Sequence, residues 1–148
     1  MRFWIKPLRG ALQGSVRGYR DTWDIRSLTA ELAYEQSIAL GMRLRVRGRY
    51  YTQTAAAFFS DDYSRAPRGQ FFTGDRELSA MKTLTFGARL AWSIPTNDEG
   101  YVLGFLDSLD LTLKGDYISY TVDNFHYGPA AIPNRHALVG TFGLEAVF

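Results

Sequence analysis

Hydrophobic and polar residues alternate with a period of two along most of this chain. The pattern is clearest in the closing stretch. There, every second residue counted back from Phe148 to Leu138 is apolar or small, and the interleaved positions include Glu145 and Thr141. Successive side chains of a β-strand point to opposite faces of a sheet, so a two-residue period predicts strands. Together with the turn signals between the alternating runs, it predicts six antiparallel strands, each paired with its sequence neighbours, at residues 10–20, 25–37, 42–53, 77–94, 108–121 and 135–148.

Two further segments are less clearly patterned. Residues 1–9 could be the remnant of a preceding strand. The segment 101–106 fits either a turn of helix or an extension of a strand.

The strand predicted at 42–53 carries a row of four arginines. Arg43, Arg45, Arg47 and Arg49 share one parity, with apolar or small residues between them. A helix would scatter these side chains around its surface, whereas a strand gathers them into a row roughly 20 Å long. We therefore expect this face of the strand to be cationic.

Other charged residues have the same polar parity on their own strands. Residues directly opposite each other on antiparallel strands interact, so the carboxylates at 31 and 35 are expected to pair with the arginine row. In a barrel this face would be the interior. The predicted charge ladder of the interior consists of Arg17, Glu31, Glu35, Arg43, Arg45, Arg47, Arg49, Arg89, Asp110, Lys114, Asp116 and Glu145.

Alternation alone fits a soluble sandwich or a lipocalin-like barrel as well as a membrane barrel. Three features favour the membrane. The predicted strands have about 10–17 residues, which exceeds the usual length of about 5–6 and approaches the span of a bilayer. The chain ends on an aromatic residue. Aromatic residues of the apolar faces also fall near strand ends, as at membrane interfaces, with Tyr34, Trp92 and Phe148 at one level and Tyr50 and Tyr117 at the other.

The predicted fold class is therefore all-β, an antiparallel up-and-down transmembrane β-barrel. The chain supplies about six strands, as a single domain over residues 1–148 or as the C-terminal segment of a larger barrel. If the last strand ends on the periplasmic side, the connections at 38–41 and 95–108 lie on that side and those at 21–24, 54–76 and 122–134 lie outside. Outer-membrane barrels have short periplasmic turns and longer outer loops, and the connection at 95–108 is longer than this rule prefers. Mid-strand apolar residues should face lipid, among them Leu32, Val46, Phe86, Leu113 and Leu144.

The composition narrows the classes of function. The formal net charge is only +2, and many of the basic residues belong to the ladder, so nucleic-acid binding is not implied. The absence of cysteine excludes a disulfide framework and a thiolate metal site. No apolar run approaches 18 residues, so no membrane-spanning helix is predicted, whereas barrel strands carry a weaker signal. The first ten residues lack the apolar stretch of a secretory signal, so we expect a mature form or the C-terminal part of a longer protein.

Two segments carry a resemblance to a known family. Residues 49–61, RYYTQTAAAFFSD, resemble one uncharacterised family of outer-membrane β-barrel proteins of Gram-negative bacteria. In that family an Arg- and Tyr-rich strand runs into a Gln-Ser/Thr-Ala-Ala segment followed by aromatic residues and Asp. Residues 74–79, GDRELS, are similar to its Asp-Tyr-Arg-Leu-Ser segment, with Glu77 inserted or shifted, and the terminal strand is similar in kind. The resemblance covers most of the chain as the C-terminal part of a barrel. It implies a location in the outer membrane and no activity, cofactor or functional residue.

No set of residues predicts catalysis or metal binding. Ser119, Asp123 and His126 are close in sequence and could form a catalytic set only if they converge in space, and ordinary loop content is the favoured interpretation. His136 is interpreted as an interface residue. Asp61, Asp62 and Asp75 lack the spacing of an EF-hand and are interpreted as solvated loop acids. We therefore expect no enzymatic activity and no cofactor.

The expected function is that of an outer-membrane barrel with a structural or porin-like role and an interior lined by arginine and glutamate. The ladder contains seven cations and five anions, and this near balance favours the structural role. The alternatives are an anion-selective channel and a soluble lipocalin-like barrel that binds a small ligand. The expected partners are outer-membrane lipid and the barrel-assembly machinery, which would bind the terminal strand ending at Phe148. Because six strands cannot close a normal membrane barrel, upstream strands or further copies of the chain are also expected.

Overall fold

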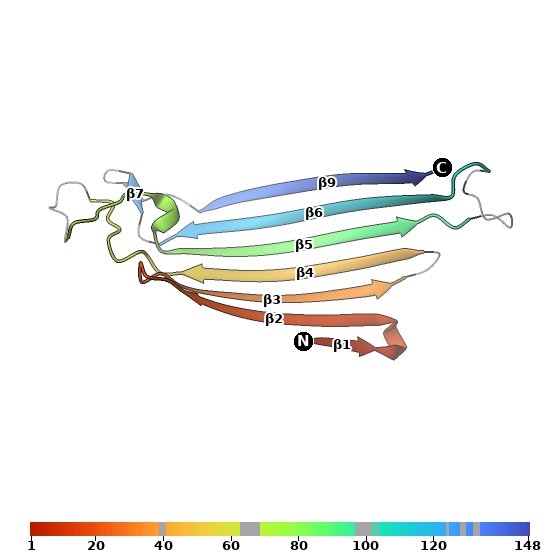
Figure 1. Cartoon of the computed structure of the whole chain (residues 1–148), viewed down its shortest axis with the longest axis horizontal. Coiled ribbons are helices and arrows are strands. Elements are labelled where there is room, and N and C mark those ends of the chain that lie inside the picture. Colours follow the sequence, from red (N-terminus) through yellow and green to blue (C-terminus); the bar gives the residue numbers. More distant parts are fainter. Residues whose placement is uncertain are drawn as a thin grey trace.

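Seven antiparallel strands form one open sheet with the order β1-β2-β3-β4-β5-β6-β9 (Figure 1). The computed structural model describes residues 1–38, 41–62, 69–96, 102, 104–123, 125–127, 130–131 and 134–148. A separate two-stranded sheet lies in the connection between β6 and β9. The strands of the main sheet are β1 (Arg2–Ile5), β2 (Gly10–Arg20), β3 (Arg26–Ser37), β4 (Met42–Gln53), β5 (Met81–Ser93), β6 (Ser108–Val122) and β9 (Arg135–Val147), and the small sheet pairs β7 (His126–Tyr127) with β8 (Ala130–Ala131).

The predicted all-β, up-and-down topology is confirmed. Residues 1–9, the possible remnant of a preceding strand, contain the short strand β1. The start of the strand predicted at 77–94 is wrong. Residues Arg76–Leu78 form a short 3-10 helix, η2, because the Asp75 side chain accepts a hydrogen bond from the Glu77 amide at its start. Another short 3-10 helix, η1 (Lys6–Leu8), reverses the chain between β1 and β2. None of the helices in the described part of the chain is long and apolar enough to cross a membrane.

The sheet does not close on itself. β1 and β9 are its two edges, so the described chain forms an open sheet rather than the predicted barrel. The strands run alternately in opposite directions, and their connections gather at two ends (Figure 1). The predicted grouping of the connections into two sets is observed. The connections after β2, β4 and β6 lie at one end of the sheet, and those after β3 and β5 lie at the other, beside the C-terminus (Figure 1).

The connection between β5 and β6 contains a tight turn where the sequence left helix and strand open. Val102 and Leu106 are linked by backbone hydrogen bonds in an antiparallel bridge, and both are buried. Gly104 lies between them with φ of 85°. A left-handed backbone of this kind suits glycine because it has no Cβ.

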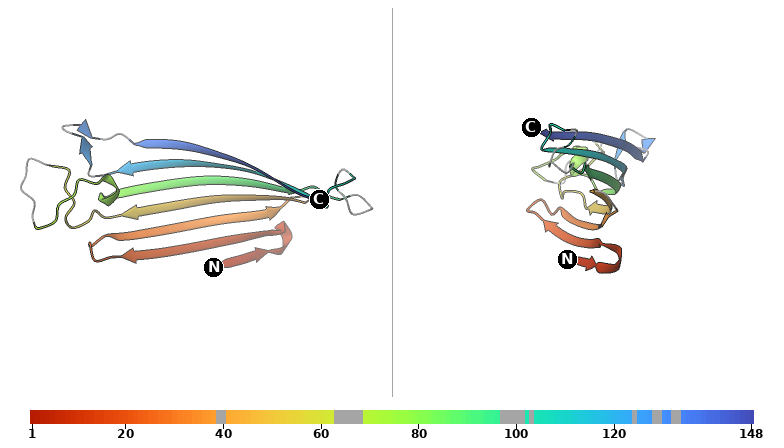
Figure 2. Two further views of the ribbon diagram at one scale, coloured as in Figure 1. Left: turned by 45° about the horizontal axis from the view of Figure 1, so that its top comes forward. Right: turned by 90° about the vertical axis from the view of Figure 1, so that its right-hand side faces the viewer.

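The sheet is a single layer, and its large apolar side chains are exposed. Figure 2 shows the strands from two further directions without a second layer packed on either face of the sheet. The buried hydrophobic residues of the described chain are few and mostly small: Ala11, Ile25, Ala33, Ala56, Val102 and Leu106. By contrast, Val16 is 75% exposed, Phe142 68% and Leu138 85%. Soluble monomeric proteins rarely expose large contiguous apolar patches to water.

Aromatic contacts tie together the connections at the end of the sheet where β2, β4 and β6 finish. The ring of Trp23 meets that of Phe58 edge-on at 5.8 Å, and Phe58 lies 6.4 Å from Phe71. Phe59 lies 6.4 Å from Phe125, which brings the connection after β6 to the same cluster. Backbone hydrogen bonds from Ala57 to Trp23 and between Phe58–Ser60 and Thr73 hold the segments in place.

We expect Gly41→Ala to destabilise the fold more than Gly104→Ala. Both glycines have positive φ, 79° and 85°, so each alanine should cost about 1 kcal/mol of conformational strain. A Cβ at Gly41 would also collide with the backbone carbonyl oxygen of Ser93, whereas nothing lies within 4 Å of one at Gly104. Urea unfolding of the two variants should therefore differ by roughly 1–3 kcal/mol, the usual cost of an overpacked contact. Equal losses would mean that the turn before β4 can shift away from β5.

Candidate functional site: the charged face of the sheet

The register of the strands places all twelve residues of the predicted charge ladder on one face of the sheet, called here the charged face. Residues opposite each other on neighbouring strands project to the same face. The cross-strand pairs Glu31–Arg49, Glu35–Arg45, Arg45–Arg89, Arg89–Lys114 and Asp110–Glu145 connect β3, β4, β5, β6 and β9. The opposite, apolar face contains Leu32, Val46, Phe86, Leu113 and Leu144.

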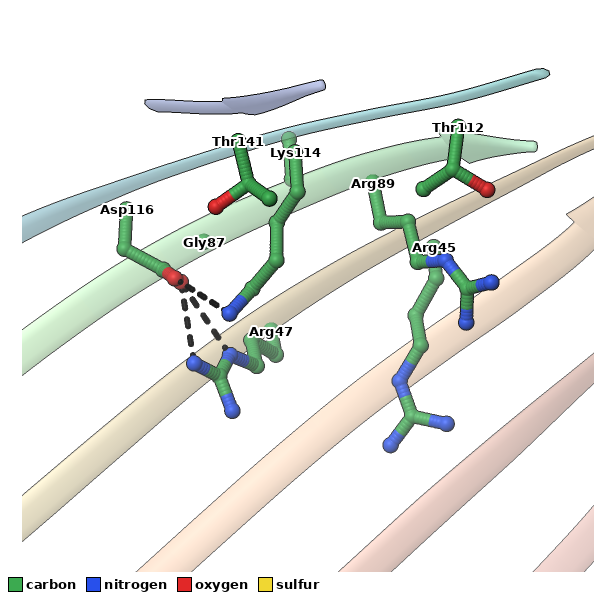
Figure 3. A pocket seen from close by; sticks show the side chains of 9 residues that line it. Arg45, Arg47, Gly87, Arg89, Thr112, Lys114, Asp116 and Thr141 are labelled. Atoms are coloured by element: carbon green, nitrogen blue, oxygen red, sulfur yellow. Dashed lines mark hydrogen bonds and ion pairs between the residues drawn. The ribbon is translucent and has the colours of Figure 1, made fainter. Parts of the chain in front are cut away.

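Asp116 is the most sheltered charged group among the described residues, and two cations converge on it (Figure 3). Its Oδ1 accepts hydrogen bonds from Arg47 Nη2 at 2.9 Å and Nε at 3.3 Å, and its Oδ2 lies 2.8 Å from Lys114 Nζ. The contacts of 2.9 and 2.8 Å have the short distances of charge-assisted hydrogen bonds. Asp116 is only 6% exposed, and such a buried carboxylate is tolerated because the cations and hydrogen bonds replace its water.

The contact between Arg47 and Asp116 passes over β5, and Gly87 makes room for it. Arg47 on β4 and Asp116 on β6 are both register partners of Gly87. A Cβ at Gly87 would collide with Asp116 Oδ1 and lie 2.9 Å from Arg47 Nε. The ion pair therefore joins two strands that are not hydrogen-bonded to each other, and it does so because the residue between them has no side chain.

Arg45 is held more loosely. Its guanidinium nitrogens lie 3.6 Å from Glu35 and 4.0 Å from Glu31. These carboxylates lie on β3, as the expected pairing of the arginine row predicts, but the distances exceed those of charge-assisted hydrogen bonds, about 2.7–2.9 Å. Within the described part of the chain no ion pair is found for four other ladder arginines, Arg17, Arg43, Arg49 and Arg89.

An open cavity of about 420 Å³ lies on the charged face over β4, β5 and β6. Its charged lining consists of Arg45, Arg47, Arg89, Lys114 and Asp116, so cations exceed anions by three. Thr112 and Thr141 add hydroxyl groups to the wall (Figure 3). This cavity combines several arginines with hydroxyl donors, and it can attract an anion.

Two other ladder carboxylates lie near one end of the sheet. Asp110 and Glu145 are opposite each other on β6 and β9. Asp110 accepts a hydrogen bond from the Ser93 hydroxyl. The charged face is therefore acidic at this end of β6 and β9, whereas its middle is cationic.

The five predicted interface aromatics lie on the apolar face or, for Phe148, just beyond the last strand. Trp92 pairs with Met42, whereas Tyr34 pairs with Val46, four residues further along β4. Phe148 stacks on Phe105 with ring centroids 6.4 Å apart. Their levels in a membrane depend on the tilt of the strands, so the grouping into two belts stays a prediction.

The candidate catalytic residues do not come together. His126 contacts Asp61, and Asp123 contacts Lys82 at 2.6 Å. Ser119 lies on the apolar face opposite His136, and His136 Nδ1 is 2.8 Å from the Tyr117 hydroxyl. The described residues contain no group of three or more side chains that could hold a metal ion. Asp75 is used in η2, and Asp61 in the contact with His126.

The contact between Asp61 and His126 was not anticipated from the sequence, because 65 residues separate them. Asp61 Oδ2 accepts from the His126 amide at 2.7 Å and lies 2.8 Å from its Nδ1. The hydrogen bond from the His126 side chain lowers the pKa of Asp61 below its usual 3.8, against the opposing effect of burial. This contact joins the connection after β4 to the connection after β6.

One comparison with known proteins finds a relationship. A family model described as "Protein of unknown function (DUF3570)" matches residues 3–103, more than half of the chain. The chain belongs to the DUF3570 family. The match includes residues 49–61 and 74–79, the segments that carry the resemblance, and it ends before β6, so the terminal strand lies outside it. No curated protein and no solved structure matches the chain. The description of the DUF3570 family names no activity, and no enzymatic family is matched.

The close approach over β5 predicts that Gly87→Ala lowers the free energy of unfolding by roughly 1–3 kcal/mol, because the added methyl displaces Arg47 from Asp116. Gly115→Ala is the matched control, since nothing lies within 4 Å of a Cβ there. In an Asp116→Ala background the nearest collision partner is gone and Arg47, 2.9 Å away through its Nε, is free to move, so Gly87→Ala should cost less. A double-mutant cycle measured by urea unfolding reports this coupling. Additive effects would contradict the described contact.

The contact between Asp61 and His126 should survive mild acid. A carboxyl whose folded pKa is lowered stabilises the contact above its unfolded pKa, 3.8, and the stabilisation is lost as the pH falls through the lower, folded value. The acid transition of the His126 amide proton resonance that reports protonation of Asp61 should therefore lie below about pH 3.8. Asp61→Asn should abolish this acid transition. A transition that persists in the variant would assign it to another carboxyl group.

Proposed function

We propose that this chain forms part of an antiparallel β-barrel in the outer membrane of a Gram-negative bacterium, with a structural or porin-like role. The apolar face contacts lipid, and the charged face lines the interior. The observation that carries the proposal is the separation of charged and apolar side chains onto two faces along the middle of six long strands, with the large apolar side chains left uncovered.

Several side chains in the middle of the charged face are more sheltered than those of the apolar face, which supports the place of the charged face inside the barrel. The side chains of Arg47 and Glu31 are 31% and 25% exposed, whereas Leu113 and Leu138 on the apolar face are 60% and 85% exposed. Side chains converge on the concave face of a curved sheet and spread apart on the convex face. A soluble lipocalin-like barrel would need the opposite arrangement, with the apolar residues inside.

The uncharged length of the apolar face fits a membrane. On β5 and its continuation, every second residue from Leu84 to Ile94 lies on the apolar face and is uncharged. This stretch is about 33 Å long at ~3.3 Å per residue. Strands of membrane barrels tilt by about 35–45°, which reduces this length to a height near the ~25 Å of their apolar band. Arg20, Arg26 and Lys82 share the apolar parity, but they lie at one end of the sheet and pair there with Asp24 or Asp123. That end would meet the water outside the membrane.

Closure of the barrel requires additional strands. Successive strands of the sheet are antiparallel, so β1 and β9, the first and seventh, point the same way. Direct pairing of β9 with β1, in one chain or between copies inserted with one orientation, would be parallel. An all-antiparallel barrel therefore needs an odd number of further strands between them, consistent with the even strand numbers of bacterial outer-membrane barrels. We expect the barrel-assembly machinery to bind β9, a long open edge that is followed by Phe148.

The ion pairs favour a structural interior over an open channel. Arg47 and Lys114 are engaged with Asp116, and Arg45 lies close to Glu31 and Glu35. The anion-selective channel remains a second candidate because several arginines of the charged face have no ion pair among the described residues. Such free cations would set the field of a water-filled interior.

The proposal is tested by arginine substitutions at two adjacent positions of β2. Val16 lies on the apolar face and is 75% exposed, whereas Ser15 lies on the charged face opposite Glu31. Val16→Arg should lower the free energy of unfolding from phospholipid vesicles by roughly 2–4 kcal/mol if Val16 is near mid-membrane. Ser15→Arg should change it by less than about 0.5 kcal/mol. Similar small losses for both variants, or failure of the parent protein to insert, would refute the membrane assignment.

A further inference from the structure

The middle of the charged face holds more positive charge than its carboxylates neutralise. Arg45, Arg89 and Lys114 occupy directly opposite positions on β4, β5 and β6, so three cations stand in one cross-strand row. Like charges in opposite positions of a sheet are destabilising. An arrangement of this kind is relieved when an anion binds between the cations.

The cations of the cavity fall into two groups. Arg47 and Lys114 make short contacts with Asp116, 2.9 and 2.8 Å, so they neutralise that carboxylate. In Figure 3 these two side chains converge on Asp116, whereas Arg45 and Arg89 extend away from it and no interaction joins either of them to another drawn residue. The two groups therefore have different tasks.

Arg45 and Arg89 keep donor capacity. Each guanidinium carries five N–H donors. The nearest carboxylates of Arg45 lie 3.6 and 4.0 Å away on β3, on the opposite side of β4 from β5. Arg89 is exposed, and the described residues include no ion pair for it. The space on the β5 side of Arg45 is thus bordered by guanidinium groups and by the Thr112 hydroxyl.

We propose that Arg45 and Arg89 form a binding site for a small oxyanion of the phosphate class in the barrel interior. The proposal rests on the proposed function, because the charged face is an interior surface only in a barrel. Arginine pairs suit a tetrahedral oxyanion because each planar fork can donate two parallel hydrogen bonds to its oxygens. Arg47 and Lys114 hold Asp116 away from the site, and Thr112 can add a hydroxyl donor.

The experiment is a titration of the full-length protein, refolded in zwitterionic phosphatidylcholine vesicles, with inorganic phosphate at low salt, followed by ³¹P NMR and calorimetry. The parent protein should bind one phosphate saturably, and added sodium chloride should weaken binding through screening. Arg89→Gln should weaken it by at least about tenfold, as expected for the loss of a charge-assisted hydrogen bond. Arg89→Lys, which keeps the charge and loses the fork, should fall between the two.

Arg17→Gln is the matched control. It removes one unpaired cation from the same face, but Arg17 lies on β2, opposite Thr29 and two strands from Arg45. Phosphate binding should be unchanged. Equal weakening by Arg17→Gln and Arg89→Gln would mean diffuse attraction rather than a site and would overturn the proposal. If the protein bound anionic lipid but did not bind free phosphate saturably, the ligand would be a lipid headgroup. That result would also overturn the proposal.

Insertion into vesicles is measured separately with the Val16 and Ser15 variants. A protein that inserts as expected but shows no saturable phosphate binding would disprove the oxyanion site and leave the membrane barrel standing. A protein that does not insert would disprove the barrel and, with it, the interior location of this site.

Discussion

The register of the sheet is the constraint on which the other features depend. One residue of slip between two neighbouring strands would move a whole set of side chains to the wrong face. The observed pairing avoids this at every junction from β2 to β9. On the charged face Arg49 lies opposite Glu31 and Arg45 opposite Glu35, and on the apolar face Leu90 lies opposite Leu44 and Leu113. The charged residues of one strand join those of its neighbours on a common face only because the alternation of charged and apolar residues is aligned from strand to strand. Both proposed properties of the protein, contact with lipid and a charged interior, follow from that alignment.

The charged face adds a second set of connections across the strands. Backbone hydrogen bonds link only adjacent strands, but the contact between Arg47 and Asp116 reaches from β4 to β6 over Gly87. Lys114 completes the neutralisation of Asp116 from the same strand. The carboxylate is nearly buried, so it needs these cations. The cations that have no ion pair among the described residues, above all Arg89, need a ligand or water to solvate their charge.

The two ends of the sheet differ in chemistry. At the end formed by the connections after β2, β4 and β6, aromatic rings and the contact between Asp61 and His126 pack the connections together. Cations with apolar parity gather there beside aspartates. At the other end the connections are tied by backbone contacts at Gly41 and by the buried pair Val102 and Leu106. Such an asymmetry suits a sheet whose ends face different surroundings.

The sequence by itself determined the strands, their order and the two faces. A period of two can be counted residue by residue, and it assigned the arginine row at 43–49 and the acids at 31 and 35 to one face without any coordinates. Residues 49–61 and 74–79, which carry the resemblance to an uncharacterised family, both lie within the match to the DUF3570 family. Local turn chemistry was harder to foresee, since the cap at Asp75 replaced the predicted start of β5 with a 3-10 helix.

Only the tertiary structure decided which opposite charges touch. Parity places Asp116 and the arginines on the same face, but the choice of Arg47 as its partner depends on the register of two junctions and on the missing side chain at Gly87. The pairing of Asp61 with His126 depends on how two long connections fold back at one end of the sheet. The open edges at β1 and β9 likewise come from the pairing of whole strands. A local pattern fixes where a side chain points, whereas its partners are set by segments distant in the chain.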